Sequence, residues 1–208
     1  MSASTKNYLA LTPVSTIISG VPIDSQGEYP LREKISDPYT SLSVYSIPTY
    51  NNRAYIAERE AIVANAKDGT KKLSETDFDA SQSVLVESSI IPPQTRGDAQ
   101  KSAVVDYWKD EHIRITASTQ LKQAILVISN SFYPGWQATI DGKKTDIYPV
   151  NIRFMGIVIP EGTHTVELRY FPSSFIKGLM MTTVGVIVTI GLFLIRKRID
   201  ALGEALPK

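Results

Sequence analysis

The residues best suited to chemistry lie in one run, Ser129–Trp136, which reads SNSFYPGW. Aromatic rings beside a Pro-Gly turn present flat π surfaces, and the C–H face of a sugar ring packs well against such a surface. Tyr133 and Trp136 are therefore candidate glycan contacts. The alternative interpretation is structural, since Pro134-Gly135 can simply turn the chain while Trp136 fills the core.

A third candidate for ligand binding is Arg153, which stands near the start of a strand pattern, NIRFMG. A guanidinium group binds a phosphate through two parallel hydrogen bonds, and it pairs with a carboxylate in the same way. Arg153 is thus either a contact for an anionic ligand such as a phosphate or one half of a structural ion pair.

Three titratable residues are the candidates for an enzyme mechanism: Asp141, His164 and Glu167. Each has a simpler interpretation, because Asp141 opens an Asp-Gly turn, His164 lies beside another turn, and Glu167 shares a strand face with Arg169. The sequence offers no nucleophile–base constellation and no pair of carboxylates at a recognisable spacing. We therefore assign no catalytic residue, and the alternative of a self-sufficient enzyme rests on these three residues alone.

Composition argues against several other classes of site. The chain of 208 residues has no cysteine, and its two histidines, His112 and His164, are far apart in the sequence. No HExxH or similar metal-ligand spacing occurs, so we expect neither a metal nor a cofactor. The net charge is +1, and no basic stripe alternates with aromatic residues, which argues against a nucleic acid partner.

The segment Phe175–Ile195 is a candidate transmembrane helix, with Lys177 as its only charged residue. A helix of that length measures about 31 Å, and the hydrocarbon core of a bilayer is about 30 Å thick. Several glycine and threonine residues within it would let partner helices approach closely, although such residues are also simply tolerated in membrane helices.

Three basic residues follow the apolar segment directly: Arg196, Lys197 and Arg198. The positive-inside rule predicts that residues 196–208 form a cytoplasmic tail and that residues 1–174 form a large extracytoplasmic domain. Phe175 and Lys177 would mark the outer end of the anchor. Because no good signal peptide precedes the domain, we expect the chain to be the last part of a longer polytopic protein.

Residues 1–174 are mainly β in pattern and predict an antiparallel β-sandwich, because short strands recur at a spacing of about 8–12 residues. The predicted strands are 42–47, 53–57, 83–87, 104–108, 112–118, 123–129, 136–140, 144–148, 153–159 and 163–170. Asp141-Gly142 predicts one hairpin turn, and Pro160-Glu161-Gly162 predicts a second. A short helix is expected within residues 58–72, ended by Asp68-Gly69. The last strand ends five residues before the apolar segment, so we expect Tyr170 near the lipid headgroups.

Several of these motifs follow one another in a recognisable order: Tyr133–Trp136, Asp141-Gly142, Arg153, Pro160–His164, Val166–Tyr170 and the final apolar helix. In this order they resemble the C-terminal segment of the YfhO-like bacterial membrane proteins. The resemblance is specific over roughly the last 80 residues and weaker before them.

The resemblance implies a link to glycosylation of cell-envelope polymers, since the family is similar to the large polytopic glycosyltransferases that use lipid-linked sugars. In such enzymes the catalytic acid is expected on an early extracytoplasmic loop, which this chain lacks. The chain would then be a non-catalytic accessory domain with a membrane anchor. Its partners would be the bilayer, other transmembrane helices, and an envelope glycan or lipid-linked sugar. The alternative is a structural or protein-interaction module that binds no glycan.

Overall fold

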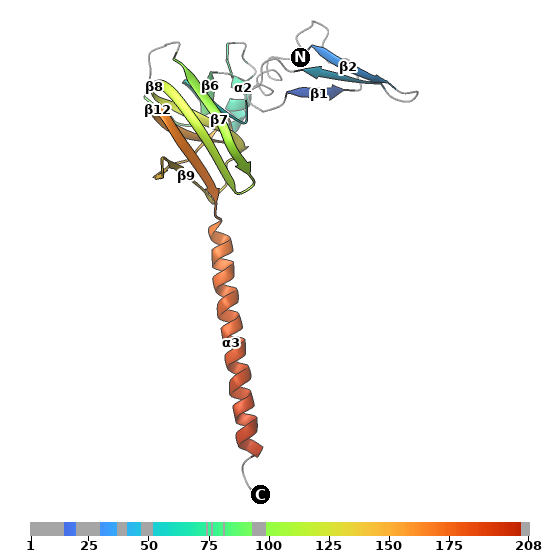
Figure 1. The fold of residues 1–208 in the computed structure, drawn as a ribbon, viewed down its shortest axis with the longest axis vertical. Coiled ribbons are helices and arrows are strands. Elements are labelled where there is room, and N and C mark those ends of the chain that lie inside the picture. The colour runs from blue at the N-terminus through green and yellow to red at the C-terminus, as the bar shows by residue number, and fades with distance from the viewer. Residues whose placement is uncertain are drawn as a thin grey trace. The chain divides into compact units, whose positions relative to one another are not determined.

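The computed structural model describes residues 15–19, 30–36, 41–46, 52–73, 75, 77–80, 82–92 and 99–204, with side chains as far as residue 198. The chain divides into two compact units, Met1–Tyr170 and Phe171–Lys208. The first unit consists mainly of antiparallel strands, and the second contains one long helix (Figure 1). The prediction of a mainly β, antiparallel fold followed by a C-terminal apolar helix is confirmed.

A seven-stranded sheet forms the centre of the first unit, and two of its strands are much longer than the rest. Its strands are β4 (Ala54–Ala57), β7 (Lys101–Lys109), β8 (His112–Ser131), β9 (Trp136–Ile140), β10 (Lys143–Thr145), β11 (Tyr148–Val150) and β12 (Phe154–Tyr170). The order is β10-β9-β12-β8-β4, with β11 also paired to β12 and β7 also paired to β8. The site described below is therefore positioned by β8, β9, β10 and β12.

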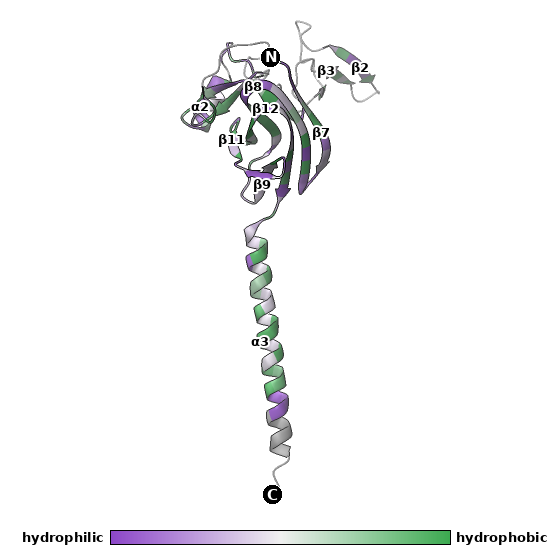
Figure 2. Ribbon diagram, turned by 60° about the vertical axis from the view of Figure 1, so that its left-hand side comes forward, coloured by the Kyte–Doolittle hydropathy of each residue, from purple (hydrophilic) through white to green (hydrophobic). Residues whose placement is uncertain are grey.

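The hairpin predicted across Pro160-Glu161-Gly162 is wrong, because this segment lies inside the continuous 17-residue strand β12. Pro160 pairs with Gln123 and Gly162 pairs with Thr119, so the register shifts there but the pairing with β8 continues. A bulge tolerates a proline and bends the strands, and Gly162 has a φ of 119° that other residues rarely adopt. The two strands predicted at 112–118 and 123–129 are likewise halves of one strand, β8. Figure 2 shows β8 and β12 curving together.

The bend gives one concave face, and that face holds the main hydrophobic core. Both halves of β8 and both halves of β12 contribute to it, together with β4 and β9. The buried members are Ala54, Ile56, Ile113, Ile115, Ala117, Ala124, Leu126, Ile128, Ala138, Met155, Ile157, Ile159, Val166 and Leu168. The layers around this core thus belong to one continuous sheet, as happens where strands bend at a corner.

The opposite face of the sheet is covered by a second core, which explains why residues 124–128 are all buried. Ile125 and Val127 point into this second core, where they join Val84 and Val86. The latter two residues lie on β6 (Ser83–Val86), which pairs in parallel with β5 (Arg59–Ile62). The strand predicted at 83–87 is therefore confirmed.

The helix predicted within residues 58–72 is only partly correct, since residues 59–62 form β5 and the helix α2 spans Ala66–Lys72. Asn65 caps α2, and its Oδ1 accepts hydrogen bonds from the backbone N–H groups of Lys67 and Asp68. Gly69 does not end the helix. It is buried within α2, and a Cβ there would lie 3.3 Å from Cγ1 of Ile152.

Asn151 joins three elements at the turn between β11 and β12, where its φ is 48°. Its backbone N–H donates to the Leu85 carbonyl at 2.9 Å, and its side-chain Oδ1 accepts from the Leu85 N–H at 2.9 Å. Its Nδ2 donates to the Tyr55 hydroxyl at 2.8 Å. Asn151 is only 6% exposed, so a single buried amide connects this turn to β6 and to β4.

A separate three-stranded sheet contains β1 (Thr16–Ser19), β2 (Leu31–Ser36) and β3 (Ser41–Ser46), in the order β1-β3-β2. β3 confirms the strand predicted at 42–47. The sequence also predicts one or two strands within residues 8–18, and most of that segment lies outside the described residues.

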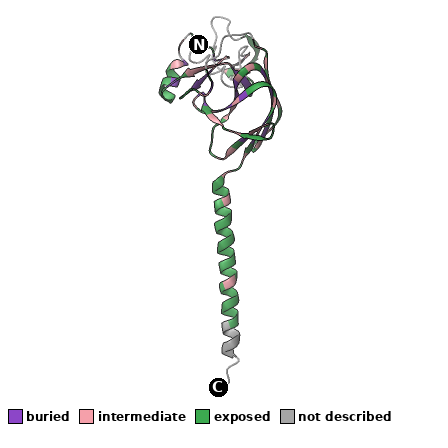
Figure 3. Cartoon of the chain, turned by 90° about the vertical axis from the view of Figure 1, so that its left-hand side faces the viewer, coloured by how far each residue is buried: buried purple, intermediate pink, exposed green. Residues whose placement is uncertain are grey.

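The second unit contains α3 (Ser173–Glu204), which is longer than the predicted 175–195. The basic residues Arg196, Lys197 and Arg198 continue the helix, because arginine and lysine are good helix formers. By length and composition, Ser173–Arg198 is able to cross a membrane, and its apolar window has no buried residue within the chain. The described side chains of α3 are almost all exposed (Figure 3).

Candidate functional site

The aromatic loop between β8 and β9 is the first candidate site. Gly135 has a φ of 116°, which lets the chain reverse between the end of β8 and the start of β9. Tyr133 is 61% exposed, whereas Trp136 is partly buried and packs against the main core. The two interpretations of Trp136 are therefore compatible, since one face of its ring serves the core and the rest remains accessible.

A third ring, Tyr170, completes an aromatic cluster that the loop alone does not reveal. Tyr170 pairs with Trp136 in the register of β12 and β9. Its ring centroid lies 5.4 Å from that of Trp136 and 6.4 Å from that of Tyr133, with tilted planes that suit aromatic pairs. The last residue of β12 thus supports both sequence-predicted glycan contacts.

The aromatic loop forms one wall of an open groove of about 560 Å³. The groove is lined by Phe132–Ala138 from the loop and β9, and by Lys144–Ile147 from β10 and the residues after it. Gln137, Lys144 and Asp146 add polar groups to the aromatic wall. Flat rings flanked by a few hydrogen-bonding groups are the combination that recognises a sugar ring by its apolar face and its hydroxyls.

The second wall of the groove, residues 144–147, could have been predicted by extending the strand pairing beyond the Asp141-Gly142 turn. The turn at Asp141-Gly142 returns β10 beside β9, and the observed register pairs Lys144 with Thr139 and Thr145 with Ala138. Residues 144–147 must then lie opposite 136–139. The sequence predicted the turn and a returning strand at 144–148, of which β10 (Lys143–Thr145) forms the first part, but this strand was not placed opposite the aromatic loop.

Arg153 lies beside the groove without lining it. Its side chain is exposed, and its carbonyl oxygen accepts a hydrogen bond from the Phe132 N–H at 2.6 Å. Within the described part of the chain, no acidic side chain forms an ion pair with Arg153. The structural ion pair considered for it is thus not formed with any described residue, and its role toward an anionic ligand stays a prediction.

Asp141 and His164, two of the three residues considered for catalysis, form a hydrogen-bonded pair. Nδ1 of His164 lies 2.7 Å from Oδ2 of Asp141, and Nε2 lies 3.2 Å from the Glu161 carbonyl oxygen. Oδ1 of Asp141 accepts from the Thr165 N–H at 2.8 Å. Both ring nitrogens of His164 therefore face acceptors, as suits a protonated imidazole.

This geometry favours a structural role for the pair. In a serine hydrolase, the histidine nitrogen remote from the carboxylate faces a nucleophilic hydroxyl. Here that nitrogen faces a backbone carbonyl. The pair instead fastens the β9–β10 turn to β12, next to the strand that carries one wall of the groove.

The stability of the fold should depend on pH because of the Asp141–His164 pair. Asp141, through its hydrogen bond to Nδ1, raises the pKa of His164 above 6.5, and burial opposes this. The hydrogen bond from His164, followed by that from the Thr165 N–H, lowers the pKa of Asp141 below 3.8. The stabilisation of the fold by His164 is full below about pH 6.5 and is lost as pH rises through the raised pKa of His164. The stabilisation by Asp141 is lost as pH falls through the lowered pKa of Asp141.

The urea midpoint of the wild-type chain should therefore exceed that of His164→Gln most clearly near pH 5, and the gap should narrow at pH 8. A gap that is constant or that widens with pH would contradict a charged pair.

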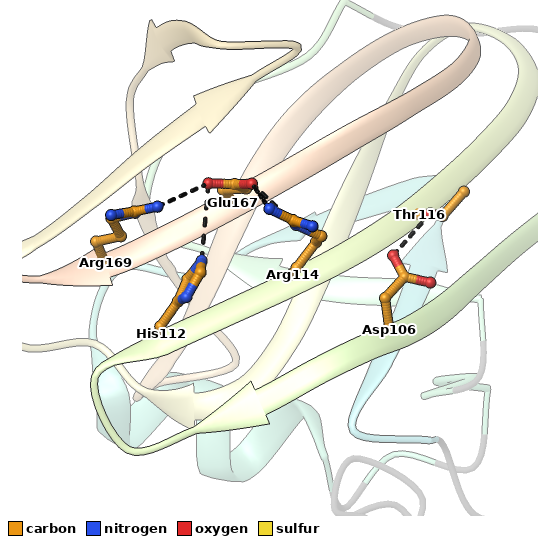
Figure 4. Close-up of polar contacts among 6 residues, drawn as sticks. All are labelled: Asp106, His112, Arg114, Thr116, Glu167 and Arg169. Carbon is orange, nitrogen blue, oxygen red and sulfur yellow. Dashed lines mark hydrogen bonds and ion pairs between the residues drawn. The ribbon is translucent and has the colours of Figure 1, made fainter.

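Glu167, the third candidate, belongs to a different cluster on the outer face of the sheet. Figure 4 shows Arg114, His112 and Arg169 gathered around its carboxylate. Arg114 Nε lies 2.9 Å from Oε1, while His112 Nε2 and Arg169 Nη2 lie 3.7 and 3.6 Å from Oε2. The Arg114 hydrogen bond is the main cause that lowers the pKa of Glu167, so this group is a carboxylate and not a proton donor at neutral pH.

The outer-face cluster was only partly predicted. The pairing of Glu167 with Arg169 was expected. Arg114 was not, because it lies on the neighbouring strand β8, where the register pairs it with Glu167 of β12. A similar cross-strand contact joins the Thr116 hydroxyl to Asp106 at 2.7 Å (Figure 4). In the described residues, no group of three or more metal-ligating side chains comes together.

The residues predicted as the membrane anchor all lie on α3: Phe175, Lys177, Arg196, Lys197 and Arg198. Phe175 is 64% exposed, and the apolar side chains that follow it are similarly open. A long helix with exposed apolar side chains on all sides is typical of a segment that lipid surrounds.

Comparisons with known proteins agree with the resemblance seen in the sequence. Residues 94–182 match the family model described as bacterial membrane protein YfhO. No curated protein and no solved structure gives a significant match. The matched range contains the strands β7 to β12, the aromatic groove and the start of α3. Over residues 94–182, this chain is therefore similar to the YfhO family of bacterial membrane proteins.

Proposed function

We propose that this chain is a non-catalytic extracytoplasmic accessory domain, with its membrane anchor, of a glycosyltransferase-like membrane protein that acts in cell-envelope glycosylation. The observation that carries the proposal is the aromatic groove. It combines Tyr133 and Trp136 with polar groups on a second wall, and it lies within the segment that matches the YfhO family.

The groove is suited to holding a glycan rather than to cutting or joining one. Asp146 is the only acidic residue among the described residues that line it, and a glycosidase requires two carboxyl groups that flank the bond. The carboxylates of Asp141 and Glu167 are engaged by His164 and Arg114. The proposed task is therefore to orient an envelope glycan or lipid-linked sugar, with Arg153 near enough to serve a phosphate on the same ligand.

Glycan titration of the full chain in lipid nanodiscs tests this role. Fragments of envelope polysaccharides should bind saturably, and Tyr133→Ala should weaken binding by roughly 2- to 12-fold, as expected for an aromatic contact worth about 0.5–1.5 kcal/mol. Tyr133 is the informative position because its side chain is 61% exposed, so its loss leaves the core intact.

Tyr107→Ala is the matched control, since Tyr107 is also an exposed tyrosine but lies on β7, outside the groove. It should leave the affinity unchanged. A flat response across all glycan fragments, or equal losses in both variants, would remove the binding role. The chain would then be better described as a structural or protein-interaction module.

A further inference from the structure

We infer that the aromatic edge of the first unit, defined as Phe132, Tyr133, Trp136 and Tyr170, contacts the headgroup region of the bilayer in which α3 is anchored. The partner is a lipid surface. The inference concerns a contact with lipid and holds whether or not the groove binds a glycan.

Strand register is the first line of support. Tyr170 is the last residue of β12, and it pairs with Trp136, the first residue of β9. Its N–H donates to the Glu111 carbonyl at 2.9 Å, which fixes the end of β12 to the turn between β7 and β8. The ring contacts of Tyr170 with Trp136 and Tyr133 then hold all three rings at one end of the sheet.

Chain length is the second line of support. β12 ends at Tyr170 and α3 begins at Ser173, so two residues separate them. Three Cα–Cα steps span at most about 11 Å, which limits the distance between the Cα atoms of Tyr170 and Ser173. Headgroup layers add roughly 5–8 Å to each side of the hydrocarbon core. The short connection thus keeps Tyr170 within reach of this layer.

Side-chain type is the third line of support. Phe132 is 41% exposed and Tyr133 is 61% exposed, side by side in one loop. Aromatic rings with a polar tip are enriched at membrane interfaces, where one end is apolar and the other is hydrated. Farther along the same strand pairs, the row of Ser102, Ser118 and Thr163 carries small hydroxyl side chains in place of aromatic rings.

A site-specific fluorophore tests the inference, because the chain has no cysteine. We would label Gln137→Cys, which is exposed beside the aromatic edge and keeps all four rings, and Ser102→Cys at the far end. Thr163, in the row of Ser102 and Ser118, lies seven residues from Tyr170, or about 23 Å along a strand. In nanodiscs of phosphatidylcholine, a headgroup spin label should quench the fluorophore at position 137 and leave that at position 102 unchanged.

The aromatic residues themselves are tested by adding Phe132→Ser and Tyr133→Ser to the Gln137→Cys chain. Quenching at position 137 should fall toward the level at position 102, whereas adding Tyr107→Ser should have no effect. Equal quenching at positions 137 and 102 would overturn the inference. Quenching at position 137 that persists in the Phe132→Ser/Tyr133→Ser chain would also overturn it, because the tether alone would then explain the proximity. Circular dichroism confirms that each variant is folded.

Discussion

Replacing Asn151 with alanine is expected to lower the free energy of unfolding of the first unit by about 2–5 kcal/mol. The change removes the Oδ1 acceptor of the buried Leu85 N–H and the amide bound to the Tyr55 hydroxyl. A buried donor that loses its partner costs about 1–3 kcal/mol, which is the largest part of the effect. Urea unfolding of the full chain in nanodiscs, followed by tryptophan fluorescence, measures it.

Asn151→Gly separates the two causes, because glycine tolerates the φ of 48° but makes neither side-chain hydrogen bond. It should be less destabilising than Asn151→Ala by about 1 kcal/mol. Asn130→Ala is the control, since among the described residues that amide accepts only from the adjacent Ser131 N–H. If Asn151→Ala is no worse than Asn130→Ala, then this buried amide does not hold the turn to β6 and β4.

Cysteine accessibility in native bacterial cells should give an all-or-none result for orientation. The cationic residues Arg196, Lys197 and Arg198 favour the cytoplasmic side of the membrane. A membrane-impermeant maleimide should therefore label Ser102→Cys in intact cells, whereas Lys208→Cys should react only after permeabilisation. Labels that appear in the reverse order would place the first unit in the cytoplasm and would remove its proposed role on envelope glycans.

Neutral substitution of the same cations provides the matched control for the orientation. The triple variant Arg196→Gln, Lys197→Gln and Arg198→Gln should weaken the charge bias, so that a fraction of Lys208→Cys becomes reactive in intact cells. No change in the triple variant would show that other segments set the orientation. It would leave the labelling of the unmodified anchor as the decisive measurement.

Local sequence patterns were sufficient to predict the elements that depend mainly on neighbouring residues. The apolar run that becomes α3 is defined by composition alone, because a bilayer requires length and hydrophobicity and little else. Alternation identified β3 and β9, and the Asp141-Gly142 turn gave the hairpin that forms the groove. Tyr133 and Trp136 could be proposed together because only two residues separate them.

Residues typical of turns led to a wrong prediction where the pairing of distant strands decided the structure. Pro160 and Gly162 are typical of a turn, yet they lie in a bulge because β8 continues to pair with β12 on both sides of them. Strand pairing also explains why residues 59–62 form a strand, since parallel pairing with the buried β6 outweighs the helical propensity of a short segment. Neither outcome is visible without knowing which strand lies next to which.

Composition and local pattern were enough to predict a β-rich domain followed by an apolar helix, and to identify the residue types that such a domain offers to a ligand. Which of these residues contact one another depends on how the strands pair. Tyr170 reaches Trp136, His164 reaches Asp141, and Arg114 reaches Glu167 across strand pairs, and each contact depends on register. Register shifts of one residue move every side chain to the other face, so pairing between distant segments fixes what local pattern leaves open.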